Sequence, residues 1–194
     1  VALRILVDKK LLTSHIKNLS IENGFSKIGI TPAAYYSEDT HYLNEWLGKK
    51  YNGSMRWMEN RAKERTNIFS YYPEAISVIV FGINYFTGYA KKKENLGKIS
   101  NYAWGDDYHI VIKRRLYKIL DSIKQNDKSV DGIVCVDTSP VTEKVWAQRA
   151  GIGWIGKHTN LITREYSSWL FLGVIIINSE LEYDLPYQDD LCGT

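Results

Sequence analysis

The run Ser77-Val-Ile-Val-Phe-Gly-Ile-Asn-Tyr85 is the stretch that decides the fold. Its near-continuous apolar character is typical of a central strand that is covered on both faces. The longest apolar run, Trp169 to Ile177, is also strand-sized and falls short of the roughly 18 apolar residues that a membrane-spanning helix needs. The sequence therefore predicts a sheet with the Ser77 run at its centre and no segment in a membrane.

Two long amphipathic helices are expected on either side of this strand in the sequence. The first runs from the capping residue Asp8 to about Asn23, where Gly24 supplies a left-handed end. The second runs from Asp106 to about Asn126, with Asp106 or the next residue as its cap. Their expected core-facing residues are Leu11, Leu12, Ile16 and Leu19 in the first helix and Ile112, Leu116, Ile119, Leu120 and Ile123 in the second.

Shorter segments complete an alternation of helices and strands. Further strands are expected over residues 25–30, 132–136, 160–163 and 169–178, and further helices over residues 38–47 and 140–150. The polar segment 87–105 is expected to be a long loop, 53–65 a loop with a helical turn, and 151–156 a flexible turn. This order favours an α/β class, more narrowly an α+β mixed sheet flanked by helices, in a single domain.

Composition and charge fit one compact domain of 194 residues, with 44% hydrophobic and 24% charged residues. The formal net charge of +3 is too small to indicate nucleic-acid binding by itself. The clusters Lys91–Lys93 and Lys113–Arg115 are either phosphate contacts or ordinary solvated faces. Cys135 lies in an apolar run and is expected to be a buried thiol, so the two cysteines do not form a disulfide scaffold. Because the first residues lack the pattern of a signal peptide, a cytoplasmic location is expected.

The stretch from Val136 to Asn160 holds the most informative residues for chemistry. Asp137 directly follows a predicted strand, where open α/β sheets place their ligands. A partly desolvated carboxyl at that position is a candidate general acid, and the alternative is that Asp137 only caps the next helix. The next helix carries polar residues that line either a pocket or an ordinary surface: Glu143, Lys144, Gln148 and Arg149.

Three glycines follow that helix, at Gly151, Gly153 and Gly156. They match G-x-G-x-x-G literally, but they follow a helix instead of opening one after a strand, so a dinucleotide site is not predicted. We expect them to let the backbone approach a bulky ligand closely. The 6 Trp and 14 Tyr residues also favour a large flat ligand.

Two further motifs concern metals. Asp107-x-His109 matches the start of the D-x-H-x-x-G signature of proteins that ligate cobalt through histidine, but Ile112 stands at the glycine position. The signature is therefore broken, and a structural histidine is the favoured reading of His109. The run Cys192-Gly193-Thr194 has the form in which a C-G-x-C iron–sulfur motif begins, although one thiol cannot hold a cluster.

Taken together, these stretches resemble the epoxyqueuosine reductases, the cobalamin and iron–sulfur enzymes of the last step of queuosine synthesis in tRNA. The resemblance covers nearly the whole chain. It rests on Lys27-Ile-Gly29, Met55-x-Trp57-Met58, Arg65 with Pro73 eight residues later, Tyr102 to His109 and, above all, Asp137 to His158. It implies a cobalamin-binding catalytic domain over residues 1–186 and the start of a truncated ferredoxin-like domain over residues 187–194.

The resemblance also implies roles for single residues. Asp137 matches the proton donor over the corrin ring, and Cys192 matches the first ligand of two [4Fe–4S] clusters whose later ligands lie outside this sequence. Positions that line or border the cobalamin site in the family are matched by Arg65, Ser100, Asp107, His109, Lys144, Lys157, His158, Leu161 and Leu172. The family binds cobalamin base-off, without a histidine on the cobalt, in agreement with the broken signature.

The partners that the resemblance implies are a tRNA carrying epoxyqueuosine and an external electron donor, for a protein expected to be a monomer. Arg149 and Lys113 are candidate contacts to the tRNA. Three alternatives stay open at this stage: a relative of the reductive dehalogenases, a flavin-binding reductase, and a non-catalytic fragment that only binds cobalamin or tRNA. Dehalogenases are usually exported, and purified flavin and cobalamin proteins differ in colour.

Overall fold

The computed structural model describes residues 8–89, 97–189 and 191–193, so the predicted basic cluster at Lys91–Lys93 lies outside the described residues. The helices are α1 (Lys9–Glu22), α2 (Ser37–Gly48), α3 (Arg56–Asn60), α4 (Ala62–Thr66), α5 (Ile68–Tyr71), the 3-10 turn η1 (Asn101–Ala103), α6 (Tyr108–Asn126) and α7 (Glu143–Arg149). The strands are β1 (Lys27–Pro32), β2 (Ser77–Asn84), β3 (Gly132–Cys135), β4 (Trp154–Ile155), β5 (Leu161–Ile162) and β6 (Leu170–Ile177). The predicted class, a sheet flanked by helices, is confirmed.

The main sheet has the strand order β1-β2-β6-β3 in the described part of the chain. β2 pairs antiparallel with β1 and with β6, and β3 pairs antiparallel with β6, so the sheet is antiparallel where a mixed one was expected. Residues 77–82 of β2 are all buried. This double coverage explains why the Ser77 run lacks the apolar–polar alternation of a half-exposed strand.

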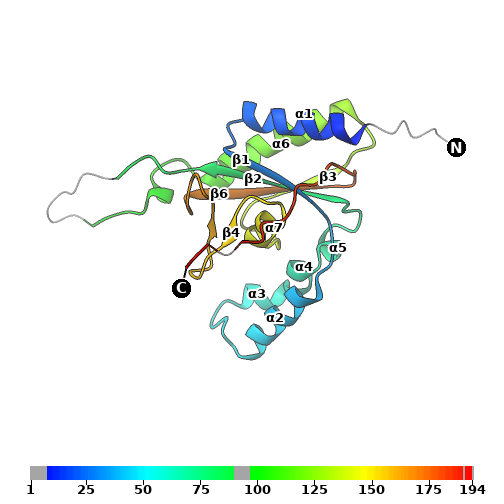
Figure 1. The fold of residues 1–194 in the computed structure, drawn as a ribbon. Coiled ribbons are helices and arrows are strands. Elements are labelled where there is room, and N and C mark those ends of the chain that lie inside the picture. Colours follow the sequence, from blue (N-terminus) through cyan, green and yellow to red (C-terminus); the bar gives the residue numbers. More distant parts are fainter. Residues whose placement is uncertain (1–7, 90–96, 190, 194) are drawn as a thin grey trace.

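The two faces of the sheet are covered by different elements. Figure 1 shows α1 and α6 together on one side and α7 with β4 on the other. Successive side chains of β2 enter the two cores in turn, because neighbours on a strand point to opposite faces. Ile79 and Phe81 belong to the cluster under α1 and α6, whereas Val78 and Val80 belong to the cluster under α7.

The two long helices follow the predictions closely. α6 buries its five expected core residues, and its cap is Asp107, whose carboxylate accepts a hydrogen bond from the His109 N–H at 2.9 Å. α1 is capped by Asp8 and followed by Gly24 at a φ of 76°. Leu12 is buried as expected, but Leu11 is 68% exposed. The assignment of Leu11 to the core is wrong because adjacent helix positions lie about 100° apart around the axis.

The short segments differ more from the expectations. Residues 53–65 hold α3 and most of α4, and these helices lie with α2 and α5 in a lobe beside the sheet (Figure 1). α7 begins at Glu143, three residues after Pro140, where a helix start was expected. The predicted flexible turn at 151–156 contains β4, which pairs with β5. No helix that the structure describes is both long and apolar enough to cross a membrane.

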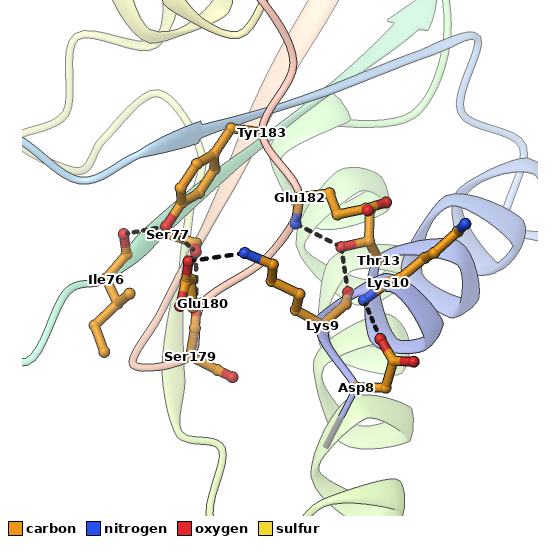
Figure 2. A network of polar contacts seen from close by, with 10 residues as sticks. All are labelled: Asp8, Lys9, Lys10, Thr13, Ile76, Ser77, Ser179, Glu180, Glu182 and Tyr183. Carbon is orange, nitrogen blue, oxygen red and sulfur yellow. Dashed lines mark hydrogen bonds and ion pairs between the residues drawn. The ribbon is translucent and has the colours of Figure 1, made fainter. Parts of the chain in front are cut away.

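The segment of residues 179–187, here called the C-terminal strap, is bound along α1 and the sheet (Figure 2). Ser77 Oγ donates to the carbonyl of Ser179 at 2.7 Å, and Thr13 Oγ1 accepts from the Glu182 N–H at 2.9 Å while donating to the carbonyl of Lys9. Further along, Leu181 is 1% exposed. The C-terminal strap is therefore packed onto the domain.

Candidate active site around Asp137

Asp137 follows β3 and adopts an uncommon backbone conformation. Its φ is 50°, in the left-handed region that aspartate tolerates better than most residues other than glycine. The Asp137 N–H donates a hydrogen bond to the side-chain carboxylate of Glu143, at the start of α7. Residues held in such conformations by surrounding contacts tend to occur at functional sites.

The side chain of Asp137 is joined to the first turn of α6. Its Oδ2 lies 2.9 Å from His109 Nε2, and His109 Nδ1 lies 2.7 Å from Asp107 Oδ1. The imidazole is thus held between two carboxylates, which accept from both ring nitrogens when it is protonated. The hydrogen bond to Asp137, followed by the one to Asp107, raises the pKa of His109 against the opposing effect of burial.

Glu143 is the second carboxyl group at Asp137. Burial raises its pKa to about 7, although the hydrogen bond from the Asp137 N–H acts in the opposite direction. The negative charge of Asp137 raises that pKa further. The pKa of Glu143 therefore lies near neutral pH, and that of His109 lies above its ordinary value.

An aromatic stack joins this cluster to the sheet. The Tyr108 ring lies 4.0 Å from the His109 ring and 4.2 Å from the Phe171 ring, and Tyr85 stacks on the other side of Phe171 at 4.3 Å. Burial, followed by the charge of Asp137, raises the pKa of Tyr108 to about 12. Tyr108 is therefore a neutral wall of the site at physiological pH.

Arg65 approaches the cluster from α4. Its guanidinium lies 4.9 Å from the ring of Trp57, and its Nε is a buried donor for which the described residues provide no acceptor. Burial and the charge of Arg61 lower the pKa of Arg65, while Glu143 raises it. A buried unpaired donor is costly unless a ligand or water satisfies it.

The other predicted residues fall into separate groups. Lys144 donates to the carbonyl of Thr159 at 3.1 Å and to Asn160 Oδ1 at 2.9 Å, so it fixes the loop before β5. Lys157 donates to the carbonyl of Gly193 at 2.7 Å. Cys192 Sγ lies 3.4 Å from Trp154 Nε1.

The remaining positions differ in exposure. Ser100 and His158 are exposed, Leu172 is half-buried and Leu161 is buried, the last two within or against the core under α7. Arg149 forms two hydrogen bonds to Asp39, at 2.8 and 2.9 Å, which tie α7 to α2. Its expected contact with tRNA stays a prediction beside this structural role.

The structure decides one of the open alternatives. Asp137 does not cap α7, because that helix has Thr142 at its N-cap and the Asp137 carboxylate contacts His109. At two of the three glycines the chain approaches itself closely, and the expected approach of a ligand there stays a prediction. An added Cβ would lie 2.0 Å from the carbonyl oxygen of Ile162 at Gly153 and 2.4 Å from that of Leu185 at Gly151.

Sequence reasoning missed the importance of Tyr108 and Phe171 and the contact of Glu143 with the Asp137 backbone. The signal for Glu143 was its place at the first position of α7, six residues after Asp137. No local pattern links Tyr108 to Phe171, because they meet only when α6 packs on β6.

The comparisons with known proteins match this region of the chain. The family model described as "Epoxyqueuosine reductase QueG, DUF1730" matches residues 65–138, a range that runs from Arg65 to just past Asp137. Epoxyqueuosine reductase of Atelocyanobacterium thalassa is 40% identical over 94% of this chain and 59% of its own length. The corresponding protein of Synechocystis is 42% identical over 86% of this chain and 58% of its own length.

Solved structures show the same fold. Epoxyqueuosine reductase from Streptococcus thermophilus has a TM-score of 0.75 at 29% identity, over 91% of this chain and 48% of that one. An epoxyqueuosine reductase crystallised with an epoxyqueuosine-modified tRNA-Tyr stem loop has a TM-score of 0.82 at 24% identity, over 95% and 49%. A reductive dehalogenase, described with a B12-dependent mechanism, has a TM-score of 0.58 at 14% identity, over 98% and 23%.

The chain therefore spans little more than half of the length of the curated relatives that it matches, from 50% to 60%. Within that span, the chain is similar to the epoxyqueuosine reductases in sequence and in fold.

Proposed function

We propose that the complete protein reduces epoxyqueuosine to queuosine in tRNA, with cobalamin as its reactive cofactor and Asp137 as its proton donor. The observation that carries the proposal is the contact series Asp107–His109–Asp137, which Glu143 supports from the backbone side. Identities of 40% and 42% to epoxyqueuosine reductases support the substrate, and the crystal structure of a relative with a modified stem loop supports tRNA as its carrier.

The residues around Asp137 suit a cobalamin. The rim of a corrin carries amide groups and its nucleotide tail carries a phosphate, so its binding site needs hydrogen-bond donors and cations. Arg65 offers a buried Nε donor without an acceptor among the described residues, and its pKa, although lowered by burial, leaves it a cation. His109 has both ring nitrogens engaged by carboxylates, which favours the proposed base-off state without a histidine on the cobalt.

When bound, a low-valent cobalamin supplies the nucleophile or electron donor that the reduction requires. Conversion of an epoxide to an alkene takes two electrons and two protons and releases the oxygen as water. Opening the ring places negative charge on that oxygen, and a positioned carboxyl group that protonates it accelerates the step by about 10²–10⁴. The Asp137 side chain is 58% exposed, so its carboxyl group is accessible to a bound substrate.

The neighbours of Asp137 keep a proton close to it and hold its backbone in this proposal. His109 lies 2.9 Å from the Asp137 carboxylate, and its raised pKa favours the protonated imidazole, so it keeps a proton within hydrogen-bond distance of Asp137. Glu143 holds the backbone of Asp137, which fixes the direction of the donor. Tyr108 stays neutral and keeps the imidazole ring in its plane by stacking.

The remaining parts of the proposal concern the source of electrons, the location of the protein and its oligomeric state. We propose that Cys192 is the first ligand of an iron–sulfur segment that receives electrons from an external donor, and that this chain alone is inactive without that segment. A tRNA substrate is consistent with the expected cytoplasmic location. We further propose that the enzyme is a monomer.

A titration of the chain with cob(II)alamin, followed by absorbance and electron paramagnetic resonance, tests the cofactor. We expect the spectra of a base-off species, lost in Arg65→Ala and retained in Asp137→Asn. As a matched control, Lys10→Ala removes an exposed cation of α1 and leaves the spectra unchanged. If neither this chain nor the complete protein alters the spectra, the assignment of cobalamin fails.

A further inference from the structure

A cavity of about 510 Å³ lies on the α6 side of the Asp137 cluster. It is bounded by the ends of β2 and β6, the first turns of α6 and the segment around η1. Five aromatic side chains line it: Tyr85, Tyr102, Trp104, Tyr108 and Phe171. A volume of this size accommodates a planar group such as a nucleobase with its sugar.

The outer rings of this aromatic cavity are exposed and held in place. Tyr102 is 55% exposed and Trp104 is 42% exposed. The Trp104 indole N–H donates to the carbonyl of Ile99 at 2.8 Å, which fixes one edge of the ring. Exposure of two neighbouring aromatic rings to water is unfavourable, and their flat faces are typical of a surface that stacks on a partner.

A basic cleft adjoins the aromatic cavity. Arg115 lines both, and in a second hollow of about 420 Å³ it is joined by Arg114 and Lys118 from the same helix. Arg115 donates to the carbonyl of Asn23 at 3.2 Å, so its guanidinium is held at the junction. The lining residues include three cations and one acid, Glu22, which leaves a positive charge suited to a phosphate.

We propose that the aromatic cavity and the basic cleft together bind one unpaired nucleotide of an RNA loop. The base stacks in the cavity, and Arg114 and Lys118 bind the adjoining phosphate. A stack of this kind requires an unpaired base, because the bases of a duplex already stack on each other. The inference rests on the proposed function, in which tRNA is the substrate, and adds a contact separate from Asp137.

The test is binding of a labelled short RNA hairpin with an unmodified loop to the chain, measured by fluorescence anisotropy without cobalamin. We expect Tyr102→Ala and Trp104→Ala each to weaken binding by about tenfold, and Trp104→Phe to retain it, because stacking needs only an aromatic face. A blunt duplex of the same composition is expected to bind more weakly than the hairpin and to be insensitive to Trp104→Ala.

The charge arm uses the salt dependence of binding. The double substitution Arg114→Ala with Lys118→Ala is expected to reduce the slope of log K against log salt by about 0.7, the value for one phosphate contact on a single strand. Lys10→Ala, which removes an exposed cation of α1, is the matched control and leaves the slope unchanged. Circular dichroism of every variant checks that the fold is retained.

Two outcomes overturn the inference. One is hairpin binding by Tyr102→Ala and Trp104→Ala at the affinity of the unsubstituted chain. The other is loss of cob(II)alamin binding in these variants with unchanged hairpin binding, which would assign the cavity to the nucleotide tail of the cofactor. Because the hairpin is unmodified and no cofactor is added, failure of epoxyqueuosine reduction in the complete protein leaves this measurement unaffected.

Discussion

The two faces of the sheet are covered in contrasting ways. On one face, α1 with 14 residues and α6 with 19 residues bury a single apolar cluster. On the other face, α7 has 7 residues, β4 and β5 have 2 each, and the chain is held by contacts between segments distant in sequence. Asp137 lies where these regions meet. The difference teaches that the long helices α1 and α6 bury most of the apolar core, whereas the short segments on the other face set the direction of the Asp137 side chain.

The largest effect is expected where the two regions meet. Asp137→Asn in the complete protein should lower turnover by about 10²–10⁴, because the amide cannot donate a carboxyl proton. The free energy of unfolding should change by less than about 1 kcal/mol, since the side chain is largely exposed. Single-turnover kinetics and urea unfolding measure the two quantities. A stability loss equal in size to the activity loss would make Asp137 a structural residue.

On the face under α6, a substitution should lower stability strongly, whereas Asp137→Asn should lower mainly activity. Leu116 is fully buried, and Leu116→Ala should lower the free energy of unfolding by about 3 kcal/mol through lost contacts and a cavity. Ile110→Ala is the matched control on the same helix, because Ile110 is 65% exposed and should change stability by less than about 0.5 kcal/mol. Equal effects of the two substitutions would contradict the division between the faces.

The pH dependence of stability sharpens the comparison at Glu143. Its pKa is about 7 in the folded chain against an ordinary value of 4.5, so the folded state binds more protons between these values. The stabilisation by the protonated carboxyl is present below pH 4.5 and is lost as the pH rises through about 7. Between these pH values the free energy of unfolding of the unsubstituted chain should decline by about 3 kcal/mol through Glu143, and Glu143→Gln should remove this decline.

Urea unfolding of both proteins at several pH values measures this difference. His109, whose raised pKa also makes stability fall with rising pH, is present in both proteins, so the difference between their curves reports Glu143 together with its charge interaction with His109. Parallel stability curves for Glu143→Gln and the unsubstituted chain would show that Glu143 does not titrate in this range.

The smallest effects are expected at the C-terminal strap (Figure 2). Thr13→Val removes a buried hydroxyl that accepts from the Glu182 N–H, and should cost about 1–2 kcal/mol. Lys9→Met removes a surface ion pair to Glu180 and should cost less than about 1 kcal/mol, because both side chains are more than half exposed. Thermal unfolding separates the two, and a reversed order would show that the strap is held by charge.

Much of the first face followed from local pattern. The caps Asp8 and Asp107, the end at Gly24 and the buried positions of α6 are all set within one or two helical turns. Leu11 was misplaced because it adjoins the buried Leu12, and a one-residue difference rotates a side chain out of the core. The short segments were predicted less well, because β4 exists only through its pairing with β5.

The sequence by itself determined the central strand, the long helices and the candidate role of Asp137, because these depend on apolar periodicity, capping residues and a recognisable motif. Only the tertiary structure decided that His109 reaches Asp137, 28 residues further along the chain, and that Glu143 holds the Asp137 backbone. It also decided that Tyr108 stacks on Phe171 and that Arg115 joins an aromatic cavity to a basic cleft. The physical reason is that hydrogen bonds and ring contacts between distant segments depend on how α6, β3 and β6 pack, which no local pattern encodes.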